Sequence, residues 1–138
     1  METANGFARS VKKYMKKLKF AKPKKVKRTT LKKKADKLFS AIVRRLGYCQ
    51  LAGKDTIRCG GSIQCAHIET RGVYGIRWEF PNALCICSGH HVYYTYHEKK
   101  WQEVIKTHFP IQWKYYEQHK NDHLIKTYED IIKELEIL

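Results

Sequence analysis

The stretches CAHIE (residues 65–69) and RWEFPNALCICSGHH (residues 77–91) decide the fold that this sequence predicts. The first belongs to a short strand that we place at residues 62–68, and the second contains an apolar strand at residues 83–87. A loop with two glycines and one proline joins the strands, and a helix is expected to follow the second strand. The pattern therefore indicates an α+β domain built around a strand–loop–strand–helix unit.

The five cysteines favour a metal site over a disulfide framework, because their number is odd and the chain has no apolar secretory leader. Two residues separate Cys87 from His90, a spacing at which two side chains can grip one ion. We expect a structural Zn²⁺ bound by Cys49, Cys59, Cys87 and His90. The alternative is that they are buried free thiols, which is our interpretation of the remaining pair, Cys65 and Cys85.

Three polar residues in these stretches have the order and spacing of a nuclease motif. His67 lies at the end of the first strand, Asn82 follows 15 residues later, and His91 lies 9 residues further along, on the helix. This arrangement resembles the HNH endonucleases, which have the His-Me finger or ββα-metal fold, and above all the small phage and prophage type. The resemblance covers residues 47–101 and includes the flanking zinc ligands typical of many members.

The resemblance implies a DNA endonuclease that hydrolyses phosphodiester bonds of duplex or branched DNA with a histidine base and one divalent metal ion. A neutral imidazole is suited to take a proton from water, so His67 is the expected general base. His91 is expected to hold Mg²⁺ or another divalent ion, which offsets charge on the phosphate. Asn82 is expected to tie the loop together, and Arg71 or Arg77 to clamp the phosphate.

One position departs from the family pattern. Many members have Asp or His immediately before the base, where it binds the catalytic metal, but this chain has Ala66. Either His91 works with another ligand or the metal binds weakly. The candidates for that further ligand are His97, Glu69 and Thr95. His90 and His91 are adjacent, so the sequence leaves open which of them binds zinc. We assign His90 to zinc and His91 to catalysis, and the reverse assignment is the alternative.

Positive charge is concentrated in the first third of the chain. The formal net charge is +15, and residues 1–48 contain 17 Lys and Arg against two acids, whereas residues 49–138 contain 11 of each. We interpret residues 1–30 as a basic, flexible arm and residues 31–46 as a first helix. Phosphate contact is the expected use of this charge, and a solubilising tail is the alternative. The expected DNA-binding residues are Lys24, Lys25, Lys27, Arg28, Lys32, Lys33, Arg44, Arg45, Arg71 and Arg77.

Residues 31–138 are expected to form a single HNH nuclease domain. Its core motif is residues 47–101, and further helices are expected near 99–108, 111–120 and 127–137. No apolar run is long enough for a bilayer, so we expect an intracellular protein without a membrane partner, in the host cytoplasm if a phage encodes it. Two alternatives to the nuclease stay open: a noncatalytic zinc-containing DNA-binding module, which Ala66 favours, and a basic RNA-associated structural protein.

Overall fold

Strands β1 (Ile63–His67) and β2 (Ala83–Cys87) pair antiparallel in a two-stranded sheet at the centre of the computed structural model. The structure describes residues 9, 12–13 and 24–138. His67, the last residue of β1, is paired with Ala83, the first of β2. This register places His67 beside Asn82 at one end of the sheet. The opposite end, where Ile63 is paired with Cys87, leads into the next helix.

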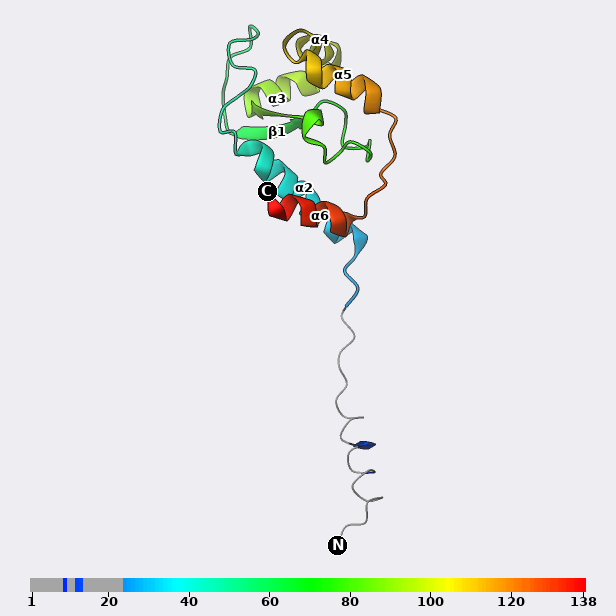
Figure 1. The fold of residues 1–138 in the computed structure, drawn as a ribbon. Helices are drawn as coiled ribbons and strands as arrows, with labels where there is room; N and C mark the ends of the chain where they lie inside the picture. Colours follow the sequence, from blue (N-terminus) through cyan, green and yellow to red (C-terminus); the bar gives the residue numbers. More distant parts are fainter. Residues whose placement is uncertain (1–8, 10–11, 14–23) are drawn as a thin grey trace.

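Helices lie on both sides of this sheet (Figure 1). On one side α2 packs against α6, and on the other side are α3, α4 and α5, while the short 3-10 helix η1 leads into β2. The bounds of these elements are α2 Arg28–Arg44, η1 Phe80–Asn82, α3 Ser88–Thr95, α4 Glu98–His108, α5 Pro110–His119 and α6 Tyr128–Ile137. The C-terminus lies near the end of α2, where the Arg45 side chain donates a hydrogen bond to the Leu138 carbonyl at 2.8 Å.

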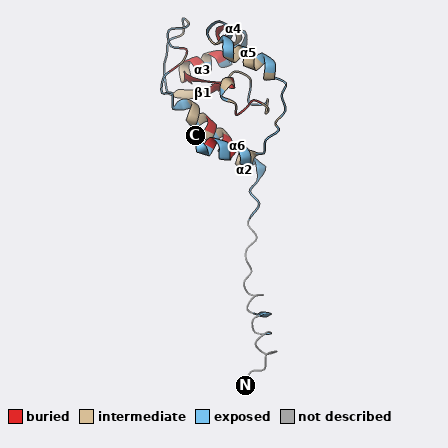
Figure 2. Cartoon of the chain, viewed as in Figure 1, coloured by how far each residue is buried: buried red, intermediate tan, exposed pale blue. Residues whose placement is uncertain are grey.

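Because helices cover both faces, β2 is buried at every position, which explains its continuous apolar sequence ALCIC. Two hydrophobic clusters result, and Figure 2 shows their buried residues along α3 and along the α2–α6 contact. The first cluster contains Leu84, Ile86, Tyr94, Trp101 and Ile105. The second contains Ala35, Phe39, Trp78, Ile131 and Leu135. The sheet is therefore packed tightly between two hydrophobic clusters. This packing also fixes the backbone positions of the residues at the ends of the sheet.

The predicted elements are present, with shifts of a few residues at their ends. The first helix begins at Arg28, so residues 28–30, which we assigned to the arm, are helical. Gly47 has a φ of 79° just beyond the end of this helix, a conformation that glycine adopts without steric cost. Most of the predicted basic arm lies outside the described residues. Among the helices that the structure describes, none has both the length and the hydrophobicity needed to cross a bilayer.

Candidate functional site

Within the described residues, the fold brings together four cysteine and histidine side chains from two separate parts of the chain. The ligand atoms of this metal cluster, Cys49, Cys59, Cys87 and His90, all lie within 4.8 Å of one another. Cys87 ends β2 and caps α3, where its sulfur accepts a hydrogen bond from the His90 backbone N–H at 3.5 Å. Cys49 and Cys59 come from the loop between α2 and β1. The four residues are therefore close enough to bind one metal ion.

The spacing within the metal cluster suits zinc. A tetrahedral Zn²⁺ with Zn–S bonds of about 2.3 Å and a Zn–N bond of about 2.0 Å separates sulfur from nitrogen by about 3.5 Å. Nδ1 of His90 lies 3.6 Å from Sγ of Cys49 and 3.7 Å from Sγ of Cys59. It lies 3.0 Å from Sγ of Cys87. Three thiolates and one imidazole are also one of the usual donor sets of structural zinc sites.

Hydrogen bonds around the metal cluster favour the metal-binding forms of its residues. Burial opposes ionisation of the Cys87 thiol, but hydrogen bonds from the His90 backbone and ring outweigh it and lower the pKa of Cys87 to about 6. Nε2 of His90 lies 2.9 Å from Oδ1 of Asp55, so Nδ1 of the fully buried ring points at the sulfurs. Asp55 in turn accepts a hydrogen bond from the Tyr94 hydroxyl at 2.5 Å. A carboxylate behind a ligating histidine fixes its tautomer and orientation.

Gly61 explains how the cysteine loop approaches α3 so closely. It has a φ of 79°, and a Cβ on it would lie 1.7 Å from Oγ of Ser88. Without that atom, the carbonyl of Gly60 accepts hydrogen bonds from the Gly89 N–H at 3.0 Å and from the Ser88 hydroxyl at 3.1 Å. The loop that carries Cys59 is thereby fastened to the helix that carries His90.

The remaining two cysteines form no disulfide. Cys65 and Cys85 face each other in the sheet register, and both are free thiols. Cys85 is buried and Cys65 is half-buried. Burial raises the pKa of Cys65 to about 12, so this thiol stays protonated. These two cysteines therefore pack as small hydrophobic side chains, as the sequence predicted.

His67 is held in one tautomer by the loop that follows β1. Its Nε2 lies 2.9 Å from the backbone carbonyl of Arg77, so Nε2–H donates and the lone pair of the neutral ring is on Nδ1. The ring stacks on Phe39 of α2, with centroids 5.6 Å apart. Burial, followed by the positive charges of Arg71 and Arg77, lowers the pKa of His67 against the opposing effect of its carbonyl hydrogen bond. The side chain is therefore neutral at pH 7 and has a basic nitrogen available.

Asn82 connects the two ends of the loop between the strands. Its side chain is fully buried, and Oδ1 accepts a hydrogen bond from the Glu69 N–H at 2.8 Å while Nδ2 donates to the Ile76 carbonyl at 3.1 Å. Its backbone carbonyl accepts a further hydrogen bond, at 2.8 Å, from the N–H of Ile68, the neighbour of His67. This geometry is the one expected of a residue that ties the loop together and fixes the backbone beside His67.

His91 lies in the first turn of α3 and faces β1. Its Nδ1–H donates to the side-chain oxygen of Gln64 at 2.6 Å, which leaves the lone pair on Nε2. Burial and then the positive charge of Arg71 lower the pKa of His91, so its ring is neutral at pH 7. Gln64 was not predicted, since a glutamine within a strand carries no distinctive signal in a single sequence.

Two cavities meet at His67, Thr70 and His91. The first, which we call the aromatic cavity, has a volume of about 350 Å³ and is lined by Trp101, Trp113 and Tyr116 together with acidic and small residues. The second, the arginine hollow, has a volume of about 540 Å³ and is lined by Arg44 and Arg71. Of the three residues shared by both cavities, the sequence analysis singled out His67 and His91 but not Thr70.

Arg77 does not reach either cavity as a free cation, which corrects our expectation for that residue. It is 7% exposed, and Nε and Nη2 donate to the two carboxylate oxygens of Asp36 at 2.8 and 2.6 Å. Its Nη1 also donates to the Arg71 carbonyl. The indole N–H of Trp78 donates to the same carboxylate at 3.0 Å. The guanidinium therefore holds the loop against α2. Of the two arginines, Arg71 is the one that lines a cavity.

The other predicted DNA-binding residues are spread along α2. Lys24, Lys25 and Lys27 precede it and are exposed, and Arg28, Lys32 and Lys33 are in its first two turns. Some of these cations already have contacts: Arg28 lies over the Tyr128 ring, and Lys32 donates to the Tyr74 hydroxyl at 3.2 Å. At the far end of the helix Arg44 lines the arginine hollow, whereas Arg45 bonds to the chain terminus.

The structure separates the three candidates for the ligand that would replace the one missing at Ala66. Glu69 and Thr95 line the aromatic cavity with His91, whereas His97 does not. The ring of His97 is exposed, stacks on Tyr93 with centroids 4.1 Å apart and lies 2.7 Å from the Tyr93 carbonyl. Glu98 also lines the cavity and was not predicted, because its approach depends on the turn between α3 and α4.

Comparisons of this chain with models of protein families, with curated proteins and with solved structures found no match. What the protein does has therefore to be inferred from its own residues.

Proposed function

We propose that this protein is a metal-dependent DNA endonuclease of the HNH type. The observation that carries the proposal is the His67 ring, which is neutral, has its lone pair on Nδ1, and sits where the arginine hollow meets the aromatic cavity. His91 is at the same junction, and Asn82 holds the loop that bonds to His67. A base, a possible metal ligand and a phosphate-binding arginine thus meet at one place on the surface.

Each residue has a defined part in the proposed hydrolysis. Nδ1 of His67 takes a proton from the attacking water, while the Arg77 carbonyl keeps Nε2–H in place. Arg71, with Arg44 on the same wall, binds the negatively charged phosphate oxygens. His91 would hold the divalent ion with help from Glu69 or Glu98. That ion, Mg²⁺ or another, supplies charge stabilisation at the phosphate and at the leaving oxygen.

The metal cluster has a separate, structural role in this proposal. Its four ligands leave no position for a substrate, which is how zinc sites that only support a fold are built. We infer that it binds Zn²⁺ and fastens the loop between α2 and β1 to α3. His91 directly follows the ligand His90, so the zinc also sets where the catalytic histidine points.

The second candidate function is a noncatalytic zinc-containing DNA-binding module. One observation favours it: Ala66 contributes only a methyl group to the cavity wall where the resemblance expects a metal ligand. Within the described residues, the metal cluster is also the one group of three or more Cys, His, Asp or Glu side chains spaced to share an ion. In this case His67 and His91 would contact DNA without promoting hydrolysis.

Incubation with supercoiled plasmid separates the two functions. Zinc-loaded protein is mixed with plasmid and Mg²⁺, Mn²⁺ or Ni²⁺, and relaxed and linear products are measured against a reaction without the added ion. The nuclease predicts ion-dependent cleavage that His67→Ala abolishes. Retention of plasmid binding with no cleavage in any of the ions would establish the binding module instead.

A further inference from the structure

The aromatic cavity and the arginine hollow differ sharply in charge. Glu69 and Glu98 line the aromatic cavity, and no Lys or Arg is present among the described residues of its wall. The arginine hollow contains Arg44 and Arg71, and its one acid, Asp36, is neutralised by the ion pair with Arg77. A DNA backbone is polyanionic, so the arginine hollow attracts it and the aromatic cavity repels it. Without a bound metal ion, the aromatic cavity therefore disfavours a phosphate and favours an uncharged group.

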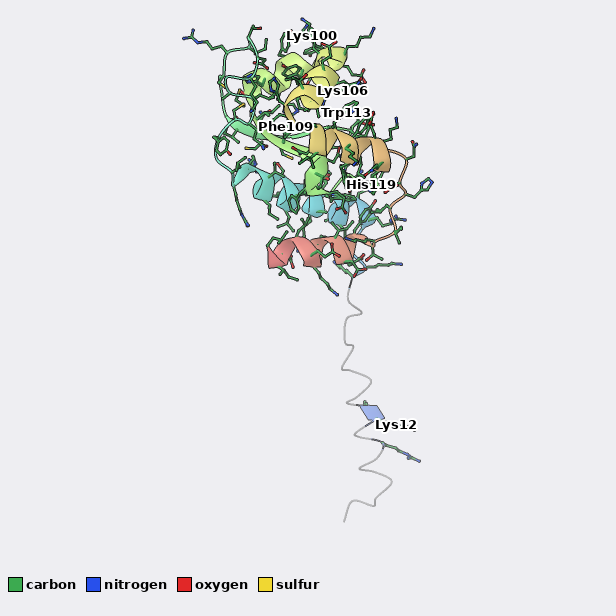
Figure 3. The ribbon with its side chains drawn as sticks, turned by 45° about the horizontal axis from the view of Figure 1, so that its top comes forward. Lys12, Lys100, Lys106, Phe109, Trp113 and His119 are labelled. Atoms are coloured by element: carbon green, nitrogen blue, oxygen red, sulfur yellow. The ribbon has the colours of Figure 1, made fainter. Side chains whose placement is uncertain are left out.

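The walls of the aromatic cavity suit a flat, uncharged ring with polar edges. Trp113 and Tyr116 on α5 are half-buried, with ring centroids 4.8 Å apart, and Trp101 of α4 is a buried residue that lines the same cavity. Figure 3 shows Trp113 at the start of α5, next to Lys106 of α4, whose ammonium lies 4.8 Å from its ring centroid. The aromatic wall is thus ordered before any ligand arrives. Rings of this kind are the surfaces on which unpaired bases stack.

Polar groups at the edge of the aromatic cavity match the edges of bases. Whichever of Glu69 and Glu98 does not bind the metal ion can accept hydrogen bonds, and the amide of Gln102 both donates and accepts them. Thr95 and Glu98 are exposed, so the cavity opens to solvent at this rim. Its volume of about 350 Å³ is within the range of cavities that hold small molecules.

We propose that the aromatic cavity accepts one unstacked nucleobase of the substrate while the adjoining phosphate lies in the arginine hollow. The inference rests on the proposed function, because it places the base beside the phosphate that His67 would attack. A base inside an uninterrupted duplex is paired and stacked, and unstacking it costs energy that a bulged, gapped or single-stranded site avoids. The protein therefore acts preferentially on DNA with an unpaired nucleotide.

Binding measurements on the full-length, zinc-loaded protein without added Mg²⁺ test this pocket. The probes are three fluorescent duplexes: one fully paired, one with a single bulged adenine, and one with a bulged abasic residue at the same position. Tighter binding of the adenine bulge than of both other duplexes is expected, by roughly 10-fold, the scale of one base stacked on an aromatic ring. Equal affinity for the adenine and abasic bulges would overturn the proposal, since only backbone distortion would then be recognised.

Variants assign the preference to the aromatic cavity. Tyr116→Ala should remove most of the preference for the adenine bulge, and Tyr116→Phe should keep it because the ring is retained. Gln102→Trp fills the cavity from α4 without removing any apolar side chain, and it should abolish the preference as well. Tyr48→Ala is the matched control, since Tyr48 is 60% exposed and lines neither cavity. An undiminished preference in both Tyr116→Ala and Gln102→Trp would overturn the assignment.

Cleavage assays distinguish failure of the pocket from failure of the nuclease. His67-dependent plasmid cleavage by a protein that binds all three duplexes equally would overturn the base pocket alone. A clear preference for the adenine bulge without cleavage in any divalent ion would support the pocket and overturn the proposed hydrolysis alone.

Discussion

Three features of the fold position His67: two contacts of its ring and the pairing of its backbone in the sheet. The Arg77 carbonyl fixes Nε2–H, Phe39 packs against the ring face, and the β1–β2 register holds the backbone. If Nδ1 is the general base, His67→Ala should lower the rate of plasmid cleavage by at least about 100-fold. Binding of DNA and zinc content should persist, because neither depends on this ring. His108→Ala, which removes an exposed histidine at the end of α4, is the matched control.

The pH dependence of cleavage follows from the direction of the His67 pKa. Burial and the nearby arginines lower this pKa below the ordinary value of 6.5. A general base works in its neutral form, so activity should rise with pH and level off once the histidine has lost its proton. The midpoint of the rise is therefore expected below pH 6.5. Initial rates of plasmid cleavage across this range measure it, and a midpoint above pH 7 would count against His67 as the titrating group.

Asp36 and Arg77 form an ion pair whose removal should destabilise the fold. Their side chains are 21% and 8% exposed, so Asp36→Ala would leave a buried guanidinium without its partner. We expect the free energy of unfolding to fall by about 3–5 kcal/mol, measured by denaturant titration. Lys34 and Glu136 form an ion pair on the surface, and their side chains are 55% and 49% exposed. Lys34→Ala breaks this pair and should lower the free energy of unfolding by no more than about 1 kcal/mol. Equal effects of the two substitutions would contradict the role of burial.

The cysteine loop between α2 and β1 contributes two of the four side chains that lie close enough to bind one metal ion. Few of its residues are buried, and it is fastened through Cys49, Cys59 and the Gly60 carbonyl to the start of α3. Asp55→Asn should weaken zinc binding by about 10- to 100-fold, because the carboxylate behind His90 would be lost. Competition with a chromophoric chelator measures the affinity. Asp122→Asn is the control, since Asp122 makes a similar but exposed contact, 2.7 Å from His119.

Local sequence signals predicted the elements well, and long-range contacts account for what they missed. The apolar run at residues 83–87 matches β2, and Thr127 caps α6 by accepting a hydrogen bond from the Asp130 N–H. The first helix starts earlier than its apolar periodicity indicates, because Arg28 lies over Tyr128 of α6. Asp55 was missed for the same reason: it is 35 residues from His90 in sequence and becomes its neighbour only in the fold.

Within the candidate site too, local spacing predicted some features, and contacts between distant residues account for the others. Residue spacing in the sequence singled out the four candidate metal ligands and the trio of His67, Asn82 and His91. Spacing did not predict that Arg77 is held in an ion pair while Arg71 lines a cavity. The difference depends on Asp36, which is 41 residues from Arg77 in the sequence. It also did not predict the aromatic cavity, because α4 and α5 carry its wall across from β1. The sequence thus predicted which of these side chains lie together, but it did not predict the hydrogen-bond and ion-pair partners of each one.

Over the whole molecule, charge separates a basic N-terminal third from a C-terminal part of zero net charge. Residues 1–23 contain seven of the 28 Lys and Arg, and the arginine hollow adds Arg44 and Arg71 near the proposed base. Cations that contact phosphate release counterions, so each contributes about 0.9 to the slope of log affinity against log salt concentration. Contacts of this kind carry no base information, and they should strengthen binding to any DNA sequence.

Replacement of the seven Lys and Arg in residues 1–23 by Gln keeps the length of the chain and removes only charge. Affinity for duplex DNA should fall, and the salt slope should become shallower by up to about six if all seven contact phosphate. Arg71→Ala should flatten the slope by only about one, because it removes one phosphate contact.

The two variants should differ in cleavage as well. Saturating DNA should restore the rate of the arm variant, whereas Arg71→Ala should stay slow because its guanidinium acts beside the reacting phosphate. An unchanged salt slope in the arm variant would mean that the basic segment stays in solvent, and the charge of the arginine hollow would then have to account for DNA binding alone.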